Sequence, residues 1–253
     1  MTRHPPAADW RSPDAYCELL HCDRRAFAWE WLRRSPAYRN RWAARNRSAD
    51  DAPGRFGLLT WVDPALAAPD ARPIWSIDTD PRVLCGRPAE GAGADHDLFD
   101  VREVSAFLSF AVDAAHIEHW LLSDGRWFVR LDLHDGTLLG GPALVEHRIA
   151  GLASAGPKLD ALRQFVALAR KGRLPASMRP KERRAAQWIL ELRVADALLE
   201  GARQQAIARA LFGHAIAAGR WRIESASYRL RVQRLVRVAR RYLAAPLSGP
   251  WFE

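Results

Sequence analysis

Apolar residues recur every three or four positions in four stretches of the second half of the chain. This spacing places them on one side of a helix, so it predicts helices at 157–170, from Pro180 onward, at 204–213 and at about 226–243. In the last helix the apolar stripe consists of Tyr228, Val232, Leu235, Ala239 and Tyr242. We therefore expect that side to pack on the rest of the protein.

The first 60 residues predict a compact helical module. Ser12-Pro13, Asp23 and Ser35-Pro36 each offer a helix start, with the first helix running to about His21 and the second to Arg34. The spacing of Phe27 and Trp31, four residues apart, favours a core role for the aromatic residues over ligand binding. These residues are Trp10, Tyr16, Phe27, Trp29, Trp31, Tyr38 and Trp42.

Prolines and glycines interrupt residues 50–97, which leaves room only for short strands at 56–62 and 74–77. Residues 104–120 are compatible with a helix. Apolar and polar residues then alternate over 126–133, and a turn at Asp135-Gly136 leads to a partner strand at 144–149. The simplest interpretation is a small antiparallel sheet in the centre of the chain.

These elements together predict an α+β fold that is mainly α. Residues 1–60 form an N-terminal helical module, residues 61–150 an acidic and partly β middle region, and residues 151–253 a basic helical domain. The charge differs between the three parts: 11 basic and 7 acidic residues in the first, 7 and 15 in the second, and 20 and 7 in the third. An acidic region beside a basic one can bind it internally, or can keep the side that does not bind DNA from sticking to nucleic acid.

The basic charge is concentrated between Arg203 and Arg241, a stretch with ten arginines, no lysine and one acidic residue, Glu224. The two helices in this stretch resemble a helix-turn-helix pair, with Ser225 as an N-cap of the second. The connection from Gly213 to Glu224 is longer than the usual three- or four-residue turn, so the motif is a variant. An arginine-rich helix can instead be a solvated face or a docking surface for an acidic protein.

Base-reading residues of a helix-turn-helix lie near the start of the second helix. This rule selects Ser225, Ser227, Tyr228, Arg229 and Arg231 for contacts with bases and nearby phosphates. Arg203, Gln204 and Gln205 are expected to position the protein on the DNA backbone. Arg234, Arg237 and Arg241 are expected to contact phosphates or a protein partner. The N-terminal module has six further arginines that either form a second basic patch or lie on solvated helix faces. They are Arg33, Arg34, Arg39, Arg41, Arg45 and Arg47.

Catalytic and cofactor chemistry is weakly indicated. His116 and His119 would be neighbours on a helix, but the spacing is not that of a zinc protease and no cysteine is near. The three cysteines, Cys17, Cys22 and Cys85, include no pair two residues apart. We expect no enzyme, no metal and no cofactor. Residues 1–9 lack the apolar region of a secretion signal and no stretch approaches 18 apolar residues, so we expect a cytoplasmic protein without a membrane partner.

Two segments near the N-terminus resemble the N-terminal module of proteobacterial regulators of conjugative elements. They are Asp9-Trp10-Arg11-Ser12-Pro13-Asp14-Ala15-Tyr16 and residues 28–38. Residues 192–198, 201–213, Trp221 and residues 228–236 are similar to the C-terminal helix-turn-helix variant of the same regulators. The whole therefore resembles the FseA-type transcriptional activators, which combine both modules. The shorter QseM-type antiactivators are similar to the C-terminal module only.

The resemblance implies a bacterial activator of genes for excision and transfer of an integrative and conjugative element. It implies that the C-terminal module contacts double-stranded promoter DNA, with RNA polymerase and an antiactivator protein as further partners. An antiactivator or adaptor that uses the basic helix to bind a protein is the alternative. Family members end in a Gly-Gly-Tyr-type motif, whereas this chain ends with Trp251-Phe252, which can dock back onto the domain or onto a partner.

Overall fold

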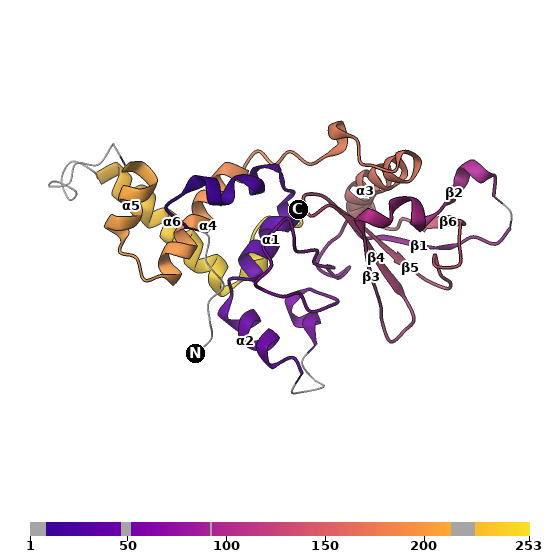
Figure 1. The fold of residues 1–253 in the computed structure, drawn as a ribbon, viewed down its shortest axis with the longest axis horizontal. Coiled ribbons are helices and arrows are strands. Elements are labelled where there is room, and N and C mark those ends of the chain that lie inside the picture. The colour runs from indigo at the N-terminus through magenta and orange to yellow at the C-terminus, as the bar shows by residue number, and fades with distance from the viewer. Residues whose placement is uncertain (1–8, 47–51, 92, 214–225) are drawn as a thin grey trace.

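The computed structural model describes residues 9–46, 52–91, 93–213 and 226–253. A helical part and a six-stranded sheet lie side by side along the longest axis of the molecule (Figure 1). The core of the helical part combines residues from both ends of the chain, whereas a second core between the sheet and α3 draws on residues 84–174. The two ends of the chain therefore fold together.

The N-terminal module contains a 3-10 helix, Pro13–His21, then α1, Arg24–Leu32, and α2, Pro36–Ala44. A short 3-10 helix, Pro53–Phe56, follows. The predicted cap of α1 is confirmed, because the Asp23 carboxylate accepts a 2.6 Å hydrogen bond from the backbone N–H of Arg25. Ser12 and Ser35 occupy N-cap positions without a side-chain capping bond, and a proline begins each of those helices.

Most of the aromatic residues of this module are core residues, as predicted for part of the set. Phe27 packs edge-on against Trp188 of α4 at 5.0 Å between ring centroids, and Trp31 packs against Tyr242 of α6 at 5.1 Å. Edge-to-face pairs of this kind add to the free energy of burial. Six of the seven are fully buried: Trp10, Tyr16, Phe27, Trp29, Trp31 and Tyr38.

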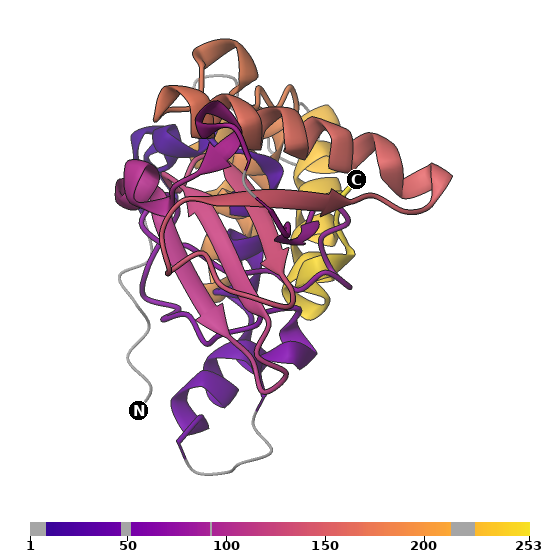
Figure 2. The same ribbon diagram turned by 90° about the vertical axis from the view of Figure 1, so that its right-hand side faces the viewer.

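The sheet has the strand order β2-β6-β1-β5-β4-β3 and is mixed. Its strands are β1 Leu84–Pro88, β2 Leu98–Phe99, β3 Leu108–Val112, β4 Glu118–Ser123, β5 Phe128–Leu133 and β6 Ala143–Arg148. Strands β1 and β5 are parallel and the other pairs antiparallel. The helix α3, Leu152–Lys171, lies across the sheet, with the helical part behind it in Figure 2. Short 3-10 helices, Asp95–Asp97 and Val101–Phe107, connect β1, β2 and β3.

Three sequence predictions for this region are wrong. The strands near 126–133 and 144–149 do not pair with each other, because β1 lies between them and makes the sheet mixed instead of antiparallel. Residues 104–120 are not a helix but the end of a 3-10 helix, β3, a turn and the start of β4. The segments 56–62 and 74–77 share only one isolated bridge, Leu58 with Trp75.

The burial of β4 explains why the last three residues of this stretch, 118–120, do not show a strand pattern. All six of its residues are buried, since Leu121 contributes to the core of the helical part and Trp120 and Leu122 to the core beneath α3. A strand covered on both faces does not alternate apolar and polar residues, so period-two patterning cannot reveal it.

The C-terminal helices follow the prediction closely. They are α4, Ala185–Leu199, α5, Gln204–Phe212, and α6, Ala226–Ala244, with short 3-10 helices at Ala176–Met178 and Pro246–Ser248. The helix expected from Pro180 begins five residues later. Within the described residues, no helix is both long and apolar enough to span a lipid bilayer.

Buried charges connect the N-terminal helices to α4. The Arg34 guanidinium makes two hydrogen bonds with the Asp196 carboxylate, at 2.7 and 2.8 Å, and the Tyr16 hydroxyl donates to the same carboxylate at 2.6 Å. Arg34 and Arg33 also pair with Glu30. Burial alone would lower the pKa of Arg34, but Asp196 and Glu30 outweigh it and raise the pKa. Arg33 and Arg34 are therefore buried ion-pair partners, not members of a basic patch or a solvated face.

The C-terminal tail returns to the core of the helical part. Trp251 is fully buried, its ring centroid lies 4.9 Å from that of Trp188 and 5.2 Å from that of Tyr242, and its indole N–H donates to the carbonyl of Pro246 at 2.8 Å. Arg24 donates to the carbonyl of Glu253 at 3.0 Å. The tail thus contacts α1, α4 and α6. It docks onto its own domain.

We expect Trp251→Ala to lower the free energy of unfolding by about 3–5 kcal/mol, because it leaves a cavity where three elements meet. Urea unfolding followed by circular dichroism measures this. Trp251→Phe, which keeps an aromatic ring but not the N–H donor, should lose clearly less. A loss below about 1 kcal/mol for Trp251→Ala would show that the tail contributes little to the core.

Candidate nucleic-acid interface

The apolar stripe of α6 packs as the sequence predicts. Val232, Leu235, Ala239 and Tyr242 are buried, Tyr228 is half-buried, and Val236 is buried in addition. The stripe contacts α4, α5 and, through Tyr242, the Trp31 ring of α1. Because the buried side of α6 contacts three other helices, its opposite side is held in a defined position. Recognition of a regular surface needs such a fixed position.

The opposite side of α6 carries an exposed row of arginines, which we call the arginine arc: Arg231, Arg234, Arg237, Arg240 and Arg241. Neither α5 nor α6 contains an acidic residue. Within the described part of the chain, no carboxylate lies within ion-pair distance of Arg234, Arg237 or Arg240. Arg234, Arg237 and Arg240 therefore form a dense positive surface without a paired carboxylate among the described residues, whereas Arg241 interacts electrostatically with Glu191 of α4.

Two members of the arc are oriented by aromatic neighbours. The guanidinium of Arg231 lies 4.7 Å from the ring centroid of Phe212, the last residue of α5, and Arg241 donates to the Tyr242 hydroxyl at 2.8 Å. The Phe212 ring in turn lies 5.3 Å from that of Tyr228. The end of α5 and the start of α6 thus meet at an aromatic pair that supports Arg231. A guanidinium stacked on a ring keeps its N–H edge free for a phosphate or a base.

The other predicted contact residues divide into three groups. Arg203, Gln204 and Gln205 are exposed at the start of α5, and Ser227 is exposed in the first turn of α6. Arg229 is half-buried. Ser225, together with the connection that contains Trp221 and Glu224, lies outside the described residues. The structure brings Tyr228 and Arg231 together through Phe212.

Three further residues lie on the exposed side of α6: Leu230, Gln233 and Arg240. Leu230 is the least expected, because 51% of this apolar side chain is exposed among the arginines. The selection of contact residues by charge overlooked Leu230 and Gln233. Each of them lies four residues before an arginine of the arc, Leu230 before Arg234 and Gln233 before Arg237, and this spacing is the signal that could have found them.

The region around His116 and His119 is not a helix face, so the predicted adjacency of the two histidines is wrong. His116 lies in a turn with a positive φ of 60°, and His119 belongs to β4. The two ring nitrogens of His119 lie within hydrogen-bond distance of carboxylates: Nδ1 is 2.7 Å from Asp132 and Nε2 is 3.2 Å from Asp113. Burial opposes the charge on His119, but these carboxylates outweigh it and raise its pKa. Among the described residues, no group of three or more potential ligands is arranged for a metal.

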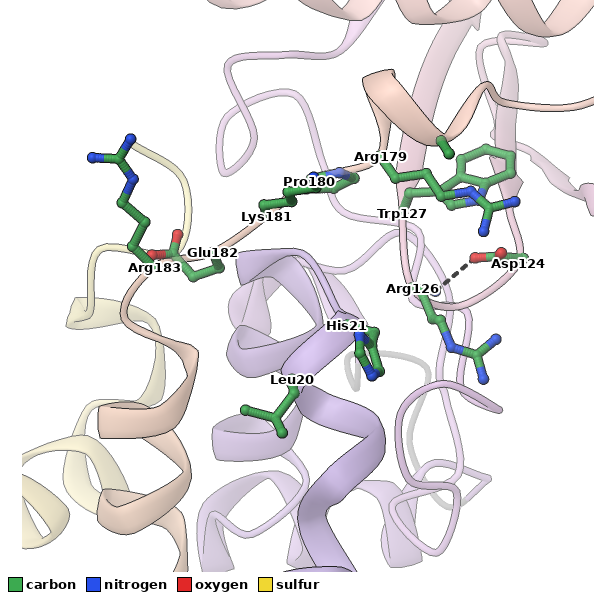
Figure 3. Close-up of a pocket in the computed structure, with 11 residues that line it drawn as sticks. Leu20, His21, Asp124, Arg126, Trp127, Arg179, Pro180, Lys181, Glu182 and Arg183 are labelled. Atoms are coloured by element: carbon green, nitrogen blue, oxygen red, sulfur yellow. Dashed lines mark hydrogen bonds between the residues drawn. The ribbon is translucent and has the colours of Figure 1, made fainter.

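A hollow of about 420 Å³ lies where the segment before α4 passes the N-terminal module (Figure 3). Two of its charged side chains form ion pairs: Arg126 with Glu18 at 2.5 Å and Glu182 with Arg24 at 2.7 Å. The Asp124 carboxylate accepts a hydrogen bond from the backbone N–H of Arg126 at 2.9 Å. These contacts hold the connecting segments together and do not place an acid and a base at a common reaction point.

Comparison with known families covers both ends of the chain. Residues 9–58 match the model of a proteobacterial transcriptional regulator-like domain, and residues 149–244 match that of a T6SS transcription factor DNA-binding domain. No curated protein matches the chain. The second match contains α3 to α6 and hence the arginine arc; neither match is specific to FseA-type activators. The two matches together support a DNA-binding regulator of transcription, a class that acts without catalysis.

Proposed function

We propose that this regulator is a transcriptional activator that contacts promoter DNA through the arginine arc of α6. The observation that carries the proposal is an acid-free row of exposed arginines on a firmly packed helix, inside the segment that matches a DNA-binding domain. Lysine and arginine contacts with phosphates release counterions, which makes such a surface bind DNA strongly at moderate salt. The target genes we propose are those for excision and conjugative transfer of an integrative element, on the basis of the resemblance to FseA-type activators.

Each contact residue has a proposed role. Ser225, Ser227, Tyr228, Arg229 and Arg231, near the start of α6, read bases and touch nearby phosphates; the planar fork of arginine matches the O6 and N7 acceptors of guanine. Arg203, Gln204 and Gln205 fix the register on the backbone, and Arg234, Arg237 and Arg241 bind phosphates. With α5 and α6 in these roles, the pair works as a variant helix-turn-helix.

We also propose a division of labour along the chain. Residues 1–60 form the regulator module and residues 151–253 the DNA-binding domain, and the acidic region 61–150 discourages DNA from binding on its side. The contacts of Arg34 and Tyr16 with Asp196 support direct coupling between the regulator module and the DNA-binding domain, because they fix the regulator module to α4. RNA polymerase and an antiactivator are the protein partners that this arrangement would serve.

Selection of bound sequences from a pool of random DNA duplexes tests the proposal. An activator of this kind should enrich one sequence motif, and that motif should occur upstream of excision or transfer genes and raise reporter transcription when the protein is present. Enrichment of a motif without reporter activation would retain DNA binding and refute activation. A pool without any enriched motif would refute sequence-specific recognition.

Arg229→Ala should weaken binding to the selected site by about 1–3 kcal/mol and relax the preference at one base position, if Arg229 reads guanine. Binding measured on single-base variants of the site checks this. Arg87→Ala is a matched control, because Arg87 is exposed on the sheet and paired with Glu146. An equal loss at every base position would assign Arg229 to phosphate binding.

The second candidate function is protein binding, as an antiactivator or adaptor. The exposed Leu230 favours it, because an apolar side chain surrounded by arginines is typical of the centre of a protein interface. Leu230→Ala separates the two: it should leave DNA binding within about twofold if α6 meets mainly phosphates, and should abolish capture of an acidic protein partner if α6 is a protein-binding helix.

A further inference from the structure

The strand β3, Leu108–Val112, forms one edge of the sheet and is unusually open. Phe110 is 46% exposed and Val112 is 52% exposed. The strand contains neither a charged residue nor a proline. Proteins generally protect sheet edges with lysine, proline, bulges or very short strands, because an open edge pairs with other chains.

The other edge of the same sheet is protected in one of these ways. Strand β2, Leu98–Phe99, has only two residues, and Phe99 is buried against Phe165 of α3. The five-residue β3 edge therefore stands apart from its counterpart.

The backbone of β3 is suitable for pairing. Just beyond the strand, the N–H of Asp113 donates to the carbonyl of Ile117 at 3.2 Å, which continues the register between β3 and β4. In an antiparallel pair, hydrogen-bonded positions alternate with positions whose N–H and C=O groups point away from the partner. Asp113 faces β4, so Val112 and Phe110 direct their backbone groups to the open edge.

The side chains of β3 are self-complementary about Phe110, the central residue. Leu108, Phe110 and Val112 share one face of the strand, and the Phe110 ring stacks on Trp120 of β4 at 4.7 Å. A second β3 running antiparallel with Phe110 at the twofold axis would pair Leu108 with Val112 and Phe110 with Phe110. The apolar stripe would then continue across both copies, and the two Asp113 carboxylates would lie at opposite ends of the ladder.

We propose that β3 binds the β3 of a second copy of this chain and joins the two sheets into one continuous antiparallel ladder across a twofold axis. A charge-free strand whose apolar pattern is symmetric about its centre fits its own copy, since it meets no like charge and loses no apolar contact. Pairing of five residues buries less than a standard interface, so the dimer should be weak, with a dissociation constant on the order of tens of micromolar.

Sedimentation velocity of the full chain over a concentration series tests the proposal. The wild-type mass should rise from the monomer value of 28.5 kDa towards twice that value as the concentration increases. Val112→Lys places a charge on the edge and should weaken the association at least tenfold. Leu152→Lys is the control, because Leu152 is fully exposed at the start of α3, away from β3. This variant should dimerise like the wild type.

A measurement on the unaltered protein guards against a variant that fails to fold. Hydrogen exchange of the peptide that covers 108–112 should slow as the protein concentration rises, while exchange in α6 stays constant. A monomer at every concentration, or a dimer in which 108–112 gains no protection, would overturn the proposal. Both results are independent of DNA binding, so they leave the proposed function untouched.

Discussion

Asp196→Ala is expected to destabilise the protein by about 3–5 kcal/mol, one of the largest single effects in the chain. The substitution removes the carboxylate that accepts two hydrogen bonds from Arg34 and one from Tyr16, all of them buried. The Arg34 guanidinium then keeps a buried charge, and Glu30 is the acidic partner that remains to it among the described residues. Chemical unfolding of the full chain, monitored by tryptophan fluorescence, measures the loss.

Two further variants separate the lost charge pair from the lost volume. Tyr16→Phe removes the hydroxyl that donates to Asp196 and should cost about 1 kcal/mol. The double variant Arg34→Met/Asp196→Leu replaces the pair by apolar side chains and should be clearly more stable than Asp196→Ala, because no buried charge is left alone. If Asp196→Ala cost less than about 1 kcal/mol, the network would not hold the regulator module on α4.

The double variant Arg234→Gln/Arg237→Gln should weaken binding to all DNA sequences by about 10- to 100-fold. Both side chains are exposed in the arginine arc, and α6 supplies no acidic neighbour. Each phosphate contact contributes about one to the slope of log K against log salt, so the slope should fall by about two. Fluorescence anisotropy with duplex DNA over a salt series measures both quantities.

A charge-matched control decides whether position or net charge matters. Arg87→Gln/Arg163→Gln removes the same charge from exposed arginines on β1 and α3, which pair with Glu146 and Asp160. This control should bind DNA within about twofold of the wild type. An equal loss in both double variants would mean that the overall charge of the protein, and not the arginine arc, determines DNA binding.

Local patterns in the sequence predicted the helical elements well. The three- and four-residue spacing from Val232 to Tyr242 identified the buried side of α6, and the aspartate before α1 identified its cap, because both depend on neighbours within one or two turns. The same periodicity placed Arg234 and Arg237 on the exposed side.

Long-range pairing was not predictable in the same way. Strand β1 contains Gly86 and Pro88, which read as loop residues, and its parallel partner β5 lies more than 40 positions along the chain. Arg33 and Arg34 looked like surface residues because their partner Asp196 lies at the other end of the sequence. Contacts of this kind depend on the tertiary fold, which local composition does not encode.

The most direct test of the account is the binding of the wild-type protein to its selected DNA site and to a scrambled duplex of the same length and composition. We expect binding to the site to be at least about a thousandfold tighter than binding to the scrambled duplex, with a steep salt dependence for both. Equal and weak binding to the two duplexes would contradict sequence-specific DNA recognition and would leave the arginine arc as a surface for an acidic protein.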